Sequence, residues 1–177
     1  MARSQAEESF AIFRQLDDNR AIAGLLLHLG ALAADRGEYT KALTLLEESL
    51  AINRELAYKS GTADSLFNLA RASYFSGGDL VKARQLLEES FAIFNQLGDK
   101  ESLAYCLCLS GLLTLEQGDT TSAYSLIEQS VALFKERRQK HGMALSTTSL
   151  AKVIAAQGDT TTARVLYEES VLLAMKA

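Results

Sequence analysis

One heptapeptide is written five times in this 177-residue chain, and its regular spacing limits the fold more than any other feature. EESFAIF occurs at residues 7–13 and again, unchanged, at 88–94, and its variants EESLAIN, EQSVALF and EESVLLA occur at 47–53, 128–134 and 168–174. The leading glutamates stand at residues 7, 47, 88, 128 and 168, so the steps between them are 40, 41, 40 and 40. A fixed period of roughly 20 to 50 residues predicts a solenoid, in which each repeat is one supersecondary unit.

A glycine divides each repeat into two predicted helices. In the first full repeat, AIAGLLLHLGALAADR (21–36) precedes the glycine and YTKALTLLEESLAINREL (39–56) follows it. The glycines expected to end the first helices in a left-handed conformation are Gly37, Gly78, Gly118 and Gly158. The acidic residues expected to cap the second helices are Glu38, Asp79, Asp119 and Asp159.

The composition favours helices throughout. Apolar residues make up 48% of the chain and are mainly Ala and Leu, both strong helix formers, while proline is absent. In the second helix of the first full repeat, Leu43, Leu46 and Leu50 form a stripe that Leu45 and Ile52 widen. A stripe this broad predicts a helix that packs on two sides, as in a stack of helix pairs. The sequence therefore predicts an all-α fold.

Small residues at fixed places in the repeat resemble the tetratricopeptide repeat. Late in the first helix they are Gly30, Ala70, Gly111 and Ala151, which follow Leu29, Leu69 and Leu150 in three of the repeats. After the turn they are Ala42, Ala83, Ala123 and Ala163. Late in the second helix, where the family's helices approach closely, they are Ser49, Ser90, Ser130 and Ser170.

The resemblance covers nearly the whole chain and implies a right-handed α-solenoid of about nine helices in antiparallel pairs. It divides the chain into the second helix of a partial repeat at 1–17 and full repeats at 18–57, 58–98, 99–138 and 139–177. The period exceeds the family's usual 34 residues and the family's closing proline is missing, so the pattern looks like the long repeats of bacterial multidomain regulators of the signal-transducing NTPase and LuxR-like types. Because no polar capping helix is evident, we expect a fragment of a longer array.

Several classes of function are disfavoured by charge and composition. The net charge of −4 and the pI near 5.3 disfavour nucleic-acid binding, which needs a basic surface. No apolar stretch approaches the ~20 residues of a membrane span. The two cysteines, Cys106 and Cys108, point about 200° apart on a helix and are interpreted as buried hydrophobic residues in a reducing compartment. We expect a soluble cytoplasmic protein.

The repeated glutamate pairs are interpreted as an exposed face and not as catalytic groups. Adjacent residues such as Glu47 and Glu48 point about 100° apart on a helix, and a catalytic pair would occur once, in a pocket. Spacing also predicts i, i+4 ion pairs between Arg84 and Glu88 and between Arg164 and Glu168. His28 and His141 lack metal-ligand spacing, and no set of nucleophile and base is evident. The prediction is a protein without enzymatic activity, cofactor or metal.

The predicted binding surface is the concave groove that the first helices of a tetratricopeptide-like solenoid line. The candidate groove residues are Leu27, Asp64, Phe67, Asn68, Arg71, Tyr74, Tyr105, Cys108, Leu112, Leu115 and Lys152. Of the family's two-carboxylate clamp only Asn68 matches, with Arg71 nearby, so chaperone C-termini are not predicted as ligands. An apolar groove with one or two polar anchors suits a peptide or an amphipathic helix.

The main functional hypothesis is a protein-interaction scaffold: the partner-docking or sensor segment of a larger bacterial regulator. The alternative is a structural solenoid that self-associates through exposed end helices and has no ligand in its groove. Direct sensing of a small molecule is a third hypothesis, but no convergent cluster of polar residues supports it.

Overall fold

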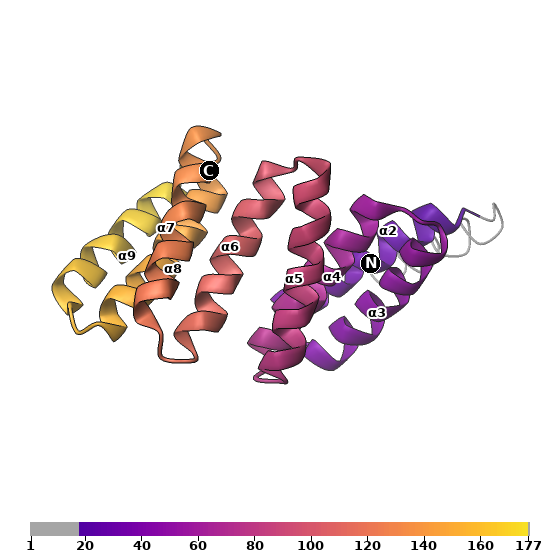
Figure 1. The fold of residues 1–177 in the computed structure, drawn as a ribbon, viewed down its shortest axis with the longest axis horizontal. Helices are drawn as coiled ribbons and strands as arrows, with labels where there is room; N and C mark the ends of the chain where they lie inside the picture. Colours follow the sequence, from indigo (N-terminus) through magenta and orange to yellow (C-terminus); the bar gives the residue numbers. More distant parts are fainter. Residues whose placement is uncertain (1–17, 177) are drawn as a thin grey trace. The chain divides into compact units, whose positions relative to one another are not determined.

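The computed structural model describes residues 18–176, which form α-helices and contain no strand (Figure 1). The helices are α2 (Asn19–Asp35), α3 (Tyr39–Glu55), α4 (Lys59–Phe75), α5 (Leu80–Leu97), α6 (Lys100–Leu115), α7 (Thr120–Glu136), α8 (Lys140–Ala156) and α9 (Thr160–Ala174). The all-α prediction is confirmed for these eight helices. The helix predicted over residues 1–17 lies outside the described residues.

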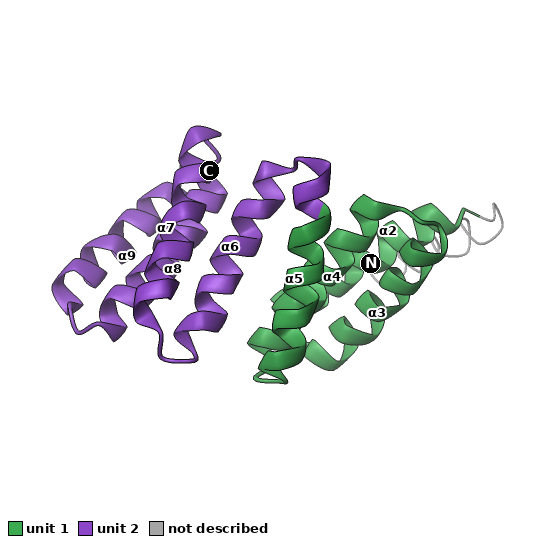
Figure 2. Cartoon of the chain, in the orientation of Figure 1, with its two compact units in different colours: residues 1–93 green, residues 94–177 purple. Residues whose placement is uncertain are grey.

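The chain forms two compact units, which divide it within α5 (Figure 2). Unit 1 comprises residues 1–93 and unit 2 comprises residues 94–177. In unit 1, α2 packs on α3, α3 packs on α4, and α2 also contacts α4. In unit 2 the same order recurs, because α7 lies against both α6 and α8, α9 packs on α8, and α6 contacts α8. Each unit therefore contains first helices that contact one another directly.

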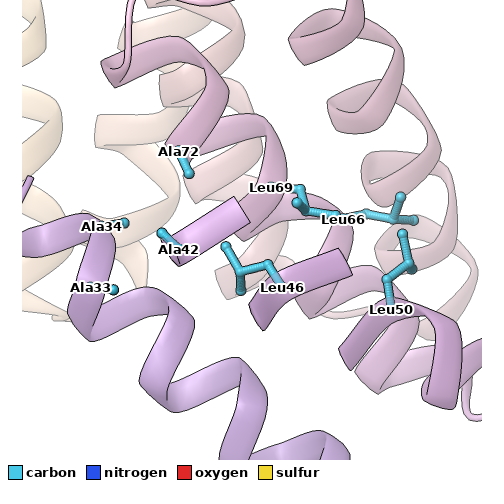
Figure 3. Packing of buried hydrophobic residues seen from close by; sticks show 8 residues of the cluster. All are labelled: Ala33, Ala34, Ala42, Leu46, Leu50, Leu66, Leu69 and Ala72. Atoms are coloured by element: carbon cyan, nitrogen blue, oxygen red, sulfur yellow. The ribbon is translucent and has the colours of Figure 1, made fainter. Parts of the chain in front are cut away.

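The core of unit 1 is made of small and branched aliphatic side chains from three helices. It contains Ala33, Ala34, Ala42, Leu46, Leu50, Leu66, Leu69 and Ala72 (Figure 3). A smaller cluster in unit 2 joins Ala123 and Ile127 of α7 to Val153 of α8. Burying these side chains supplies the main favourable free energy of folding, at about 25 cal/mol for each Å² of apolar surface removed from water.

The close helix contacts explain the small residues of the repeat. A Cβ atom on Gly30 would lie 2.6 Å from Cγ of Leu46, and one on Gly111 would lie 2.4 Å from Cγ1 of Ile127. Late in the second helices, the hydroxyl of Ser49 donates to the carbonyl of Ala23 at 2.9 Å. The small residues therefore let each pair of helices approach, and the serine ties the pair together in the core.

Most of the described first helices end at the predicted glycine, which adopts a left-handed conformation. Gly37 has a φ of 76°, its N–H donates to Ala34 O, and the N–H of Glu38 donates to Ala33 O, which together satisfy the free carbonyls of the last turn. In the second repeat the left-handed residue is Gly77, with a φ of 67°, and not Gly78 as predicted. The reason is that α4 ends one residue before Ser76, which places Gly77 directly after the C-cap.

Acidic residues cap three of the four predicted second helices. Asp79 Oδ1 accepts from the N–H groups of Val81 and Lys82, at 2.8 and 3.0 Å. Asp119 and Asp159 accept in the same way from Ser122 and Thr162, each at 2.9 Å. Glu38 makes no side-chain cap, and its carboxylate instead pairs with Lys41 at 3.2 Å.

Candidate functional site

The candidate groove residues of unit 1 lie on α2 and α4. They are all half-buried, and they are Leu27, Asp64, Phe67, Asn68, Arg71 and Tyr74. On α4, Phe67 and Asn68 lie three and four residues after Asp64, and Arg71 and Tyr74 follow at further steps of three, so these residues share one side of the helix. The side-chain amide of Asn68 donates to the carbonyl of Asp64 at 2.9 Å, which orders this row.

The candidate groove residues of unit 2 differ in their exposure. Tyr105 and Leu115 are half-buried and Lys152 is exposed. Cys108 and Leu112 are buried, with 2% and 5% of their surface exposed. Their side chains therefore contribute to packing inside unit 2.

A pocket of about 240 Å³ lies in unit 1 at the end of this row. Its wall combines the last turn of α2, the first residue of α3 and the last turn of α4. The lining residues are Ala34, Asp35, Tyr39, Arg71, Ala72 and Phe75. Phe75 is 47% exposed, and its ring stands edge-on to that of Tyr74, with 5.0 Å between the ring centroids. The pocket thus has aromatic and small apolar walls and one polar side.

Arg71 supplies the polar side of the pocket. Its Nη1 lies 2.9 Å from Oδ1 of Asp35, and its Nη2 donates to the side-chain oxygen of Asn68 at 3.4 Å. Its Nε is buried and has no hydrogen-bond partner among the described residues. Because Asp35 balances the charge of Arg71, the pocket offers directed N–H donors without a net positive charge.

The corresponding place in unit 2 carries different side chains. Counting along the repeat, Thr120 takes the place of Tyr39, and Ala156 takes the place of Phe75. The two aromatic walls are therefore a property of unit 1. Arg71 was predicted from the sequence, but Asp35, Tyr39 and Phe75 were not, because they come from the ends of helices on different sides of a turn. The one available signal was the pair of adjacent aromatic residues, Tyr74 and Phe75, at the end of the predicted helix.

Tyr105 of unit 2 is held by polar and aromatic contacts. Its hydroxyl accepts a hydrogen bond from Nε2 of Gln139 at 3.2 Å, and its ring lies edge-on to that of Phe134, with 4.7 Å between the centroids. Burial raises the pKa of the Tyr105 hydroxyl. Tyr105 is thus a neutral, fixed residue at ordinary pH.

The thiol of Cys108 is also kept neutral. Burial raises its pKa, and its Sγ–H donates to the hydroxyl of Ser149 at 3.3 Å. Cys106 is fully buried. A neutral buried thiol is a poor nucleophile, which agrees with the interpretation of both cysteines as small hydrophobic residues.

The repeated glutamates of the described repeats lie on the outside, as predicted. Glu47 and Glu48 are exposed, and Glu47 lies 3.4 Å from Nζ of Lys82 on α5. Glu89 accepts from Nη2 of Arg54 at 2.7 and 2.9 Å. In unit 2, the predicted i, i+4 pair of Arg164 and Glu168 is present at 3.8 Å. Exposed pairs of this kind gain about 0 to 1 kcal/mol each.

Between residues 18 and 176, no three or more His, Cys, Asp or Glu side chains are grouped to hold a metal ion. None of the helices described there has the length and hydropathy that a membrane crossing requires.

Comparison with protein families places the chain among helical-repeat proteins. The tetratricopeptide repeat model matches residues 21–96. A second model, described as anaphase-promoting complex subunit 5, matches residues 67–157, which is just over half of the chain. No curated protein matches the chain significantly.

Solved structures agree with this fold. The crystal structure of BtubC (BKLC) from P. vanneervenii superposes with a TM-score of 0.73 at 17% identity, over 99% of this chain and 75% of that one. A crystal structure of a putative kinesin light chain from Podosopora anserina, with nearly identical TPR-like repeats, gives a TM-score of 0.51 at 22% identity, over 98% and 94% of the two chains. Identities this low are informative about the fold alone.

The chain has a tetratricopeptide-like helical fold, and the tetratricopeptide repeat model matches a little under half of it. Through the second match it also belongs to the sequence family described as anaphase-promoting complex subunit 5. That description names another protein and assigns no role in its complex to this chain. Repeats of this type generally mediate contacts between proteins, and the fold and the family therefore define a protein-interaction module.

Proposed function

We propose that the chain docks a peptide or an amphipathic helix of a partner protein on the first helices of its pairs. The observation that carries this proposal is the pocket beside Arg71. The half-buried row that ends with Arg71 and Tyr74 leads toward the pocket, whose walls include Tyr39 and Phe75. Amphipathic helices and peptides are bound on surfaces of this kind. One anchor side chain of the ligand fills the pocket, and the neighbouring side chains of the ligand lie along the partly exposed row.

The chemistry of the pocket indicates the anchor. Ala34 and Ala72 at the wall, together with the aromatic rings, suit a large apolar side chain. The guanidinium of Arg71 suits a backbone carbonyl or another neutral oxygen beside that side chain, because Asp35 already provides the negative charge. The proposed partner segment is therefore apolar, with a neutral hydrogen-bond acceptor next to the anchor.

The remaining candidate residues keep their proposed role in binding, each within its own unit. In unit 2 these are Tyr105, Leu115 and the exposed Lys152, and in unit 1 they are Leu27 and Phe67. In the wider setting proposed from the sequence, this surface is the sensor or docking segment of a larger cytoplasmic regulator.

The test uses peptides selected from a displayed random library on the wild-type chain. The affinity of a selected peptide, measured by fluorescence anisotropy, should fall at least about tenfold in Arg71→Ala and in Phe75→Ala, as expected for residues that hold an anchor. Val81→Ala is the matched control, because Val81 is 68% exposed on α5 and lies outside the pocket. Full affinity in both pocket variants, with helicity retained, would exclude this site.

A second function is favoured by a different observation. Bulky apolar side chains are exposed on α9, the last described helix, and we propose that the chain self-associates through this end. This assembly does not use the pocket beside Arg71, so each function is testable without the other.

A further inference from the structure

The turn between α7 and α8 carries the densest group of cations in the sequence. Residues 135–141, here called the basic turn, read KERRQKH and have a net charge of +3 with His141 neutral, whereas the whole chain has −4. The corresponding residues of the two preceding turns read RELAYKS at 54–60 and NQLGDKE at 95–101, with net charges of +1 and −1. The positive charge is therefore a property of this turn and not of the repeat.

Three cations of the basic turn are exposed and face no carboxylate. Lys135, Arg138 and Lys140 are exposed, and none of them forms an ion pair with an acidic side chain between residues 18 and 176. Nζ of Lys140 donates instead to the backbone carbonyl of Lys176 at 2.5 Å, which leaves its charge unbalanced. The basic turn thus presents positive charge that the described fold does not neutralise.

The carboxylates beside the basic turn are already engaged. Glu136 lies 3.7 Å from Nζ of Lys100, and Glu101 lies 3.8 Å from Nε of Arg137. Glu101 also accepts a hydrogen bond from Nε2 of Gln139 at 3.2 Å. These contacts balance the fourth cation of the turn but leave the three others available to a ligand.

Local structure favours other residues at three of these positions. Arg138 has a φ of 53°, and the corresponding residues of the preceding turns, Gly98 and Ala57, share this left-handed conformation but are small and uncharged. Lys140 and His141 are the first two residues of α8, where the positive end of the helix dipole disfavours cations. The positive charge is therefore present in spite of local preferences, which is what a functional requirement for it would produce.

Buried groups hold the backbone of the basic turn in place. The N–H of Gln139 donates to the carbonyl of Phe134 at 3.0 Å, and Nε2 of Gln139 donates to the Tyr105 hydroxyl at 3.2 Å. Phe134 is fully buried, and a Cβ atom on Gly142 would lie 2.4 Å from its ring. The cations therefore project from a fixed backbone, which reduces the entropy that a bound ligand would cost.

We propose that the basic turn binds an acidic segment of a partner protein, whose Asp or Glu side chains pair with Lys135, Arg138 and Lys140. The guanidinium of Arg138 presents paired N–H donors that match the two oxygens of a carboxylate, and the two lysines act as point charges. This site lies in unit 2 and shares no residue with the pocket beside Arg71, so it is independent of the docking function proposed above.

A short acidic peptide fits this surface better than a nucleic acid does. The cations lie within one turn of the chain, and the carboxylates of Glu136 and Glu101 lie beside them. A nucleic acid has a phosphate at every nucleotide and would extend over these carboxylates and over a chain with a net charge of −4. A peptide can place its few carboxylates on the cations alone.

The test measures the binding of two fluorescein-labelled probes to the complete chain by fluorescence anisotropy. The probes are an oligoglutamate peptide of about eight residues and a single-stranded oligothymidylate of about the same charge, both at about 50 mM salt, where exposed charges are weakly screened. The wild-type chain should bind the peptide more tightly than the oligothymidylate, and its affinity for the peptide should fall as salt is added.

A double variant locates the site. Arg138→Gly with Lys140→Gln should weaken peptide binding at least about threefold, because two exposed ion pairs are lost. Arg138→Gly alone should not lower the melting temperature, since glycine adopts the left-handed conformation readily, so weaker binding will not reflect unfolding. The matched control is Arg20→Gln with Lys59→Gln, which removes the same charge from exposed residues of unit 1 and should leave the affinity unchanged.

Three outcomes would overturn the proposal. One is a wild-type chain that does not bind the peptide at concentrations up to about 1 mM. Another is an equal affinity change, or none, in the double variant and in its control, because binding would then not depend on the basic turn. The third is an oligothymidylate that binds more tightly than the peptide and is weakened by the same double variant, which would make the basic turn a nucleic-acid site.

Discussion

The hydroxyl oxygens of Ser130 and Ser146 lie 2.8 Å apart in the core of unit 2, where two successive helix pairs meet. Ser130 also donates to the carbonyl of Ala104 at 2.7 Å, so Ser146 is the donor in the contact between the two serines. A similar contact is present in unit 1, where the hydroxyl oxygens of Ser49 and Ser65 are 3.0 Å apart and the side-chain amide of Asn53 donates to both. A serine of the repeated heptapeptide thus links its own pair of helices to the next pair.

Replacing Ser130 should weaken this link. Ser130→Ala leaves the carbonyl of Ala104 and the hydroxyl of Ser146 buried without these partners, and the expected loss is about 1 to 3 kcal/mol in the free energy of unfolding. Urea denaturation followed by circular dichroism measures it. Ser170→Ala is the matched control, because that hydroxyl bonds only within α9, and it should cost less than about 1 kcal/mol. Equal losses in the two variants would contradict the role assigned to Ser130.

Two glycines inside helices should respond in opposite directions to alanine. In Gly111→Ala the new Cβ meets Cγ1 of Ile127 at 2.4 Å and the carbonyl of Ala123 at 3.1 Å, so overpacking should cost about 1 to 3 kcal/mol. In Gly24→Ala nothing lies within 4 Å of the new Cβ, and the lower backbone entropy of alanine should stabilise the chain by about 0.5 to 1 kcal/mol. Thermal unfolding of both variants checks the signs, and a stabilised Gly111→Ala would contradict the close approach of α6 and α7.

The caps of α7 and α9 should make stability depend on pH. Hydrogen bonds from Ser122 lower the pKa of Asp119, and those from Thr162 lower the pKa of Asp159. A carboxyl whose folded pKa is depressed stabilises the fold above its unfolded pKa and loses that effect as pH falls through the folded pKa. The melting temperature should therefore decrease from about pH 5 downward.

The control for this pH dependence replaces both caps with asparagine. Asp119→Asn with Asp159→Asn keeps the capping oxygens but removes the titration, since asparagine caps helices about as well as aspartate. The double variant should melt close to the wild-type temperature at neutral pH and should lose less stability in acid. An identical acid profile for the two chains would show that these caps do not contribute.

The sequence by itself determined the helices and their turns. A period of 40 residues, the absence of proline and a glycine in the middle of each repeat leave little choice of local structure, because these signals act within a few residues of the chain. The predicted helices at 21–36 and 39–56 agree with α2 and α3 to within two residues at each end. The exposed position of Glu47 and Glu48 followed from repetition alone.

Local signals were weaker where two neighbouring residues could end the same helix, or where two residue types could cap a helix. Gly77 and Gly78 have the same intrinsic freedom, so the choice between them depended on where α4 ends. Glu38 resembles Asp79 in charge, but it pairs with Lys41 and makes no side-chain cap.

Only the tertiary structure decided which side chains share a surface. The pocket joins Asp35, Tyr39 and Phe75 from three helices, and the ion pair between Arg71 and Asp35 crosses 36 positions in the sequence. Cys108 and Leu112 belong to the same helical row as the half-buried candidates Tyr105 and Leu115 but are buried by the packing within unit 2. Repetition specifies each helix pair, whereas exposure depends on which neighbouring pair covers it, and that is a property of the assembled fold.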